Sequence, residues 1–151
     1  MDSFSTDDNG DDLSNLWWDD ALTLLHDKLV VREKPTLIHC HMGVNRAPSL
    51  AGVVLVAFYN YHPSIVWKML RSCRPMAWAY YLPNGYRWLA TNQKWLQVRD
   101  VEPEALLTAA DDIEQQLRLN KDSIDHVIRT IRVMERNREV VTQKSVSMKM
   151  K

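Results

Sequence analysis

Hydrophobic positions recur with helical spacing over most of this chain. Between residues 15 and 31, apolar side chains return every three or four positions, which is the period of an amphipathic helix. Ser14 precedes this run and belongs to a residue type that commonly caps helix N-termini. The same spacing, or a continuous apolar stretch, predicts further helices at about 47–61, 64–73, 86–98, 104–119 and 123–141.

Two segments between the predicted helices have other patterns. Thr36–His39 is short, apolar and β-prone, which favours a buried strand. After Cys40 the chain passes through a short segment that contains Gly43 and then enters an apolar helix, so the order is strand, tight loop, helix. Farther on, Pro83-Asn84-Gly85 is typical of a turn in an aromatic-rich loop.

Composition restricts the class of protein. With 151 residues, 46% hydrophobic residues, four Gly and six Pro, the chain is expected to form one soluble globular domain with a real core. The 19 basic and 19 acidic side chains balance, which argues against nucleic-acid binding through bulk charge. The apolar run at 50–59 is too short to span a membrane, and the N-terminus resembles no signal peptide, so a cytoplasmic location is expected.

The C-terminal part carries an excess of basic residues and one apolar stripe. Within the predicted helix at 123–141, apolar side chains lie along a single face from Ile124 to Met134. This stripe could bind a partner helix through residues 124–134, whereas the surrounding charges are more simply a solvated face.

The residues that point to chemistry lie between Cys40 and Arg46. A thiol that faces the N-terminus of a helix is favoured as a thiolate by the helix dipole and by free backbone N–H groups. Five intervening residues can curl into a cup of N–H groups that binds an anion, and Gly43 permits the positive φ that such a cup needs. The planar guanidinium of Arg46 suits two oxygens of a phosphoryl group. The predicted phosphate-binding residues are His41, Met42, Gly43, Val44, Asn45 and Arg46.

Two segments carry a resemblance to a known family. HCHMGVNRAPSL resembles the HC-x5-R signature of the cysteine-dependent protein tyrosine phosphatases, and LPNGYRWL resembles a downstream segment of their small dual-specificity group. The resemblance covers about residues 6–96 and implies an α/β fold with a strand, phosphate-binding loop and helix core, followed mostly by helices. It also implies a catalytic domain over residues 1–100, with 101–151 as a helical extension that ends in a frayed basic tail.

The implied activity is hydrolysis of a phosphate monoester through a phosphocysteine on Cys40, without a metal or organic cofactor. The substrate would be a phosphorylated protein, with a lipid or RNA phosphate as other possibilities. In the family an Asp some 30 residues before the Cys acts as general acid and base, and Asp7 and Asp8 lie at this distance. The alternative is that these carboxylates belong to a solvated acidic loop.

The sequence departs from the family pattern in two places. Ala47 stands where family members usually have Ser or Thr, whose hydroxyl helps the thiolate leave. Met1 lies only a few residues before Asp7, so the N-terminal part of the family's sheet is expected to be missing. Both departures favour the alternative of a weakly active or inactive phosphate-binding pseudo-phosphatase that serves as an interaction module.

Overall fold

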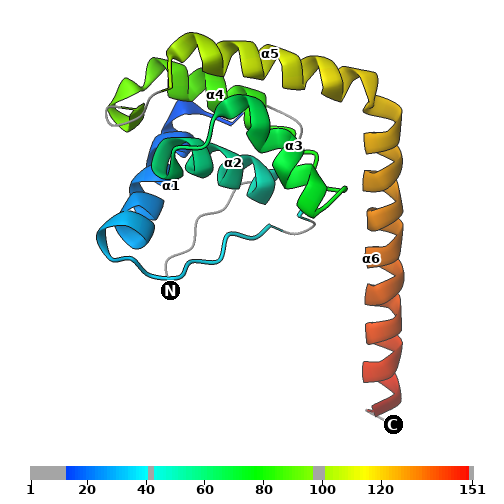
Figure 1. The fold of residues 1–151 in the computed structure, drawn as a ribbon. Coiled ribbons are helices and arrows are strands. Elements are labelled where there is room, and N and C mark those ends of the chain that lie inside the picture. The colour runs from blue at the N-terminus through cyan, green and yellow to red at the C-terminus, as the bar shows by residue number, and fades with distance from the viewer. Residues whose placement is uncertain (1–12, 41–42, 97–100, 150–151) are drawn as a thin grey trace. The chain divides into compact units, whose positions relative to one another are not determined.

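The described part of the protein is helical. A computed structural model describes residues 13–40, 43–96 and 101–149, the last nine of these as backbone only. The helices are α1 (Asn15–Leu25), α2 (Arg46–Tyr59), α3 (Pro63–Cys73), α4 (Leu82–Thr91), α5 (Pro103–Leu119) and α6 (Lys121–Lys149), shown in Figure 1. A π-helical stretch, η1 (His26–Val31), extends α1, and a short 3-10 helix, η2 (Gln93–Leu96), follows α4. None of these residues forms a strand, so the prediction of an α/β fold is wrong.

The predicted strand at Thr36–His39 is an irregular, mostly exposed segment. Residues 33–40 have no regular secondary structure, and the side chain of Leu37 is 82% exposed. A strand is stable only when a neighbouring strand pairs with its backbone groups, and the described ranges offer no such neighbour. Local β propensity at these positions therefore has no tertiary contact to support it.

Contacts divide the chain into two compact units, residues 1–117 and 118–151. In the first unit α2 packs against both α3 and α4, and α1 packs against α4 (Figure 1). The second unit consists mainly of α6, which extends beyond the predicted end of this helix. On α6 the predicted stripe begins at Ile124, which is buried, and ends at Met134, which is 64% exposed.

The start of α1 follows the sequence prediction. Ser14 caps the helix by accepting a hydrogen bond from the backbone N–H of Trp17 at 3.1 Å. One turn on, Trp18 is fully buried, and its indole Nε1 donates to Asn84 Oδ1 of α4 at 2.8 Å. The ring of Trp18 also stacks on Trp88, with 6.2 Å between ring centroids. These contacts join α1 to α4.

The predicted turn at Pro83-Asn84-Gly85 lies inside the first turn of α4 instead. Proline is tolerated at the start of a helix because the backbone N–H groups there lack intrahelical partners. Gly85 allows the close approach of two neighbouring side chains. A Cβ atom at this position would lie 2.6 Å from Val53 Cγ2 and 2.7 Å from the Trp18 ring. Turn-forming residue types thus serve here to start and pack a helix.

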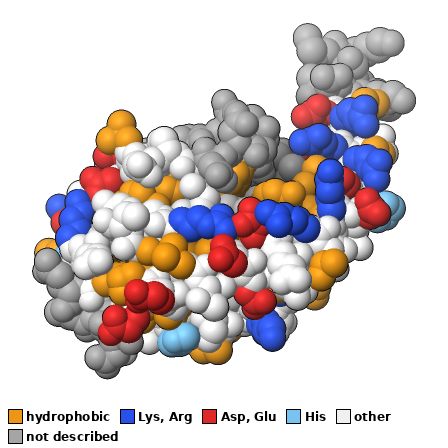
Figure 2. All heavy atoms as spheres, turned by 90° about the horizontal axis from the view of Figure 1, so that it is seen from above, with side chains coloured by type: hydrophobic (Ala, Val, Ile, Leu, Met, Phe, Trp, Pro, Cys, Tyr) orange, Lys and Arg blue, Asp and Glu red, His pale blue; other side chains and the backbone are white. Residues whose placement is uncertain are grey.

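Charged side chains join α4 to α5. Arg87 Nη2 donates to Asp111 Oδ1 at 2.9 Å and also forms an ion pair with Glu114. These charges lie partly in solvent, where an ion pair contributes little to stability. On the face shown in Figure 2, acidic and basic side chains are interspersed with hydrophobic ones, in keeping with the balanced charge of the chain.

The buried Tyr86 predicts a loss of stability in alkali. Its hydroxyl donates to the Pro63 carbonyl at 3.1 Å, and burial raises the pKa of Tyr86 because the phenolate would be poorly solvated. Above about pH 10 only the unfolded chain loses this proton, so the contribution of Tyr86 to the free energy of unfolding decreases as the pH rises. Tyr86→Phe is expected to cost about 1 kcal/mol at neutral pH through the lost hydrogen bond.

This cost should shrink above about pH 10, because Phe has no proton to lose. Urea unfolding of both proteins at neutral pH and above pH 10 measures the change, and tyrosines common to both cancel in the difference. A gap that stays constant with pH would contradict the assignment.

Candidate functional site

The candidate site lies between the irregular segment that ends at Cys40 and the start of α2 at Arg46. Cys40 is a free, half-buried thiol, and its Sγ accepts a hydrogen bond from the backbone N–H of Gly43 at 3.3 Å. Gly43 therefore lies beside the cysteine that begins this loop.

Gly43 has the backbone geometry that the sequence predicts. Its φ is +66°, in the left-handed region where other residues are strained. The N–H of the same residue donates the hydrogen bond to Cys40 Sγ.

Arg74 is a basic residue of the site that sequence analysis missed. It follows α3, and its guanidinium lies against Gly43, since a Cβ atom built at position 43 would be 2.8 Å from Arg74 Nη1. A second guanidinium beside the loop adds positive charge to a site that already contains Arg46. No local motif marks Arg74, because α3 brings it to the loop through the tertiary fold.

Hydrogen bonds from residues 79–81 hold the end of the loop that leads into α2. The N–H of Ala79 donates to the Val44 carbonyl at 2.9 Å, and the N–H of Tyr80 donates to Asn45 Oδ1 at 3.3 Å. The next N–H, that of Tyr81, donates to the hydroxyl of Ser49 in α2 at 3.0 Å. Val44, Asn45 and Ser49 are all buried, so these bonds anchor the end of the loop in the protein core.

The other predicted site residues are only partly located. Arg46 is half-buried at the first position of α2. Val44 and Asn45 lie in the loop, where their side chains serve packing and hydrogen bonding, so an anion would meet only their backbone. His41 and Met42 lie outside the described residues, as do the candidate acids Asp7 and Asp8. The structure thus brings together Cys40 and Gly43 and adds Arg74.

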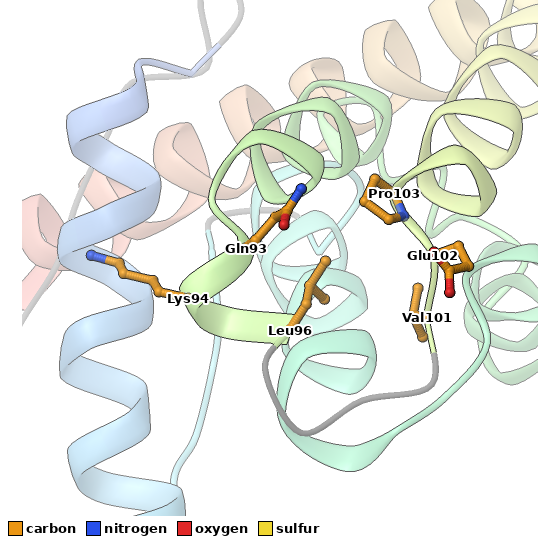
Figure 3. Close-up of a pocket in the computed structure, with 6 residues that line it drawn as sticks. All are labelled: Gln93, Lys94, Leu96, Val101, Glu102 and Pro103. Carbon is orange, nitrogen blue, oxygen red and sulfur yellow. The ribbon is translucent and has the colours of Figure 1, made fainter.

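A separate hollow of about 330 Å³ lies near η2 and the start of α5. Figure 3 shows its lining residues, which are Gln93, Lys94, Leu96, Val101, Glu102 and Pro103. Lys94 Nζ pairs with Asp19 of α1 at 2.8 Å. The described residues of the predicted phosphate-binding loop, Gly43 to Arg46, do not line this hollow.

The described ranges, residues 13–40, 43–96 and 101–149, contain neither a candidate metal site nor a candidate membrane span. No group of three or more His, Cys, Asp or Glu side chains lies close enough together there to hold a metal ion. Over the same ranges no helix is both long and apolar enough to cross a lipid bilayer.

Comparison of the chain with protein-family models, with curated proteins and with solved structures found no match.

Proposed function

We propose that this protein hydrolyses phosphate monoesters through a phosphocysteine intermediate on Cys40. The observation that carries the proposal is the hydrogen bond from the Gly43 N–H to Cys40 Sγ, directly before a helix of 14 residues. A nucleophile, an inward-pointing N–H group and a helix N-terminus in one short loop favour an anionic substrate. Arg46 and Arg74 supply the positive charge that a phosphoryl group requires.

In the proposed reaction the Cys40 thiolate attacks phosphorus, so that an S–P bond forms and the P–O ester bond breaks. The leaving oxygen takes a proton from the carboxylic acid that we assign to Asp7 or Asp8. Water then attacks phosphorus while the same carboxylate accepts its proton. The S–P bond breaks, which releases inorganic phosphate and restores the thiolate. Arg46 and the loop N–H groups hold the equatorial oxygens in both steps.

The substrate that we propose is a phosphorylated protein in the cytoplasm, with Tyr, Ser or Thr as the phosphorylated residue. We also propose that a helix of a partner protein binds to residues 124–134. The exposed side chain of Met134 is consistent with such a contact.

Ala47 favours a second candidate function, a phosphate-binding module without turnover. It occupies the first turn of α2, and its own side chain has no hydroxyl to assist the departure of the thiolate. Such a module would bind the phosphorylated group of a partner and retain it. The two candidates share the anion site and differ only in hydrolysis.

Anion binding by the loop tests both candidates through thermal unfolding. Vanadate or phosphate at about 100 times the dissociation constant should raise the Tm by about 5 to 10 °C, because only the folded loop binds the anion. Arg46→Ala should remove this shift. Arg46→Lys should retain part of it, since Lys keeps the charge but loses the planar fork.

The control is Arg129→Ala, which removes an exposed basic residue of α6 and should leave the shift unchanged. If the wild-type protein shows no shift, or Arg46→Ala retains all of it, the loop is not the anion site.

A further inference from the structure

Opposite charges are separated into blocks along the second half of this chain. Residues 100–125 contain eight acidic and two basic side chains, whereas residues 129–151 contain seven basic and two acidic ones. The first block includes α5, and the second includes most of α6. The balanced charge of the whole chain therefore conceals two segments that attract each other.

One side of α6 carries exposed arginines together with exposed valines. These side chains recur at spacings of three and four residues, so they lie on one side of the helix. They form what we call the basic face, which consists of Arg129, Arg132, Val133, Arg136 and Val140. The two valines are 45% and 48% exposed. Helical spacing places the predicted stripe from Ile124 to Met134 on the other side of α6, so the basic face is a separate surface.

The exposed side of α5 carries acidic and apolar side chains that match the basic face. Glu104 and Asp112 are exposed, and within the described part of the chain neither forms an ion pair. Leu107, on the same side, is 43% exposed. We call these three residues the acidic face. Its two carboxylates are about 12 Å apart along the helix axis, and Arg129 and Arg136 are about 10 Å apart along theirs. The charges of the two faces can therefore pair along the length of the contact.

We propose that two copies of this protein associate, with the basic face of each copy bound to the acidic face of the other. Antiparallel helices of one chain are usually joined by about two to five residues, whereas only Asn120 separates α5 from α6. The connection therefore favours a second copy as the occupant of each face.

Two-fold symmetry makes this contact twice, because each copy offers both faces. Exposed ion pairs contribute little individually, so the stability of the dimer also requires burial of the valines and of Leu107. The charges mainly select which surfaces meet. The inference does not depend on hydrolysis by Cys40.

Analytical ultracentrifugation over a range of concentrations tests this inference. The wild-type protein should form a dimer that weakens at about 1 M salt, where the Debye length is about 3 Å. One variant carries Arg129→Glu, Arg132→Glu and Arg136→Glu, and a second carries Glu104→Lys and Asp112→Lys. Each variant alone should associate at least about tenfold more weakly, because both contacts would then join like charges. An equimolar mixture of the two should restore the dimer, since every contact again joins opposite charges.

The matched control carries Arg32→Glu, Lys34→Glu and Lys68→Glu, which reverse three exposed basic residues outside both faces. It has the same net charge as the first variant and should dimerise like the wild-type protein. Circular dichroism should show the same helix content in all variants, because every substituted side chain is exposed.

The inference is overturned if the wild-type protein stays monomeric up to about 1 mM, or if either variant alone dimerises as well as the wild type. It is also overturned if the mixture dimerises no better than the separate variants, as expected if the two faces met within one chain. A dimer that neither binds nor hydrolyses a phosphate ester would instead overturn the proposed function and leave this inference intact.

Discussion

Replacing Cys40 with Ser should abolish phosphate monoester hydrolysis, with a loss in kcat of about 10³-fold or more. A serine hydroxyl is a far weaker nucleophile than a cysteine thiol, so the group that receives the hydrogen bond from Gly43 would attack phosphorus much more slowly. Release of phosphate from an aryl phosphate, measured over a range of enzyme concentrations, gives the loss. The substitution is nearly isosteric, so the fold and the Tm should change little.

Cys73→Ser provides the matched control. Cys73 ends α3 and is exposed, in contrast to the half-buried Cys40, and it should be dispensable for hydrolysis. Equal activity in the wild-type protein and Cys40→Ser would exclude the phosphocysteine. A wild-type protein that binds phosphate but hydrolyses no ester would establish the binding module in place of the enzyme.

Gly85→Ala is expected to destabilise the protein by about 1 to 3 kcal/mol, although Ala is the better helix former. The new methyl group would lie 2.6 Å from Val53 Cγ2 and 2.7 Å from the Trp18 ring, distances at which neighbouring atoms must move. Val is stiff at χ1, and the fully buried Trp18 is held by its hydrogen bond to Asn84, so neither can easily withdraw. Urea unfolding measures the loss.

Gly52→Ala is the comparison for this prediction. Its methyl group would meet Leu82 Cδ1 at 2.7 Å and Leu70 Cδ1 at 3.3 Å, which are the ends of flexible side chains. These atoms can move at lower cost, so the loss should be smaller than for Gly85→Ala. A Gly85→Ala protein as stable as the wild type would show that α4 does not depend on close contact with Trp18.

The helices could be predicted because each depends on a local pattern. The apolar spacing at 15–31 corresponds to α1 and η1, and Ser14 caps this helix as expected. The strand at Thr36–His39 was predicted on the same kind of local signal, but a strand depends on a neighbour that no local signal can guarantee. The turn at Pro83-Asn84-Gly85 was wrong for a related reason, since the need for Gly85 arises from Trp18, far away in the sequence.

The candidate site also combines features that the local sequence could predict with features that depend on distant residues. The positive φ of Gly43 could be expected from its residue type and its place in the motif, whereas the hydrogen bond from its N–H to Cys40 is seen only in the structure. Arg74 and the N–H groups of residues 79–81 reach this loop only because α3 and the segment after it fold back on α2. Their contacts could not be recognised from residue types, since an arginine at a helix end and aromatic residues in a loop are common in any protein.

The contacts of Trp18 also affect the order in which the protein can form during synthesis. Its partners Asn84, Gly85 and Trp88 all belong to α4, and Asn84 lies 66 residues later in the chain. At about 5 to 20 residues per second, a ribosome needs about 3 to 13 s to make the intervening segment. During that interval the apolar face of α1 lacks the α4 surface that covers it. The nascent chain should therefore be a substrate for chaperones until α4 has emerged.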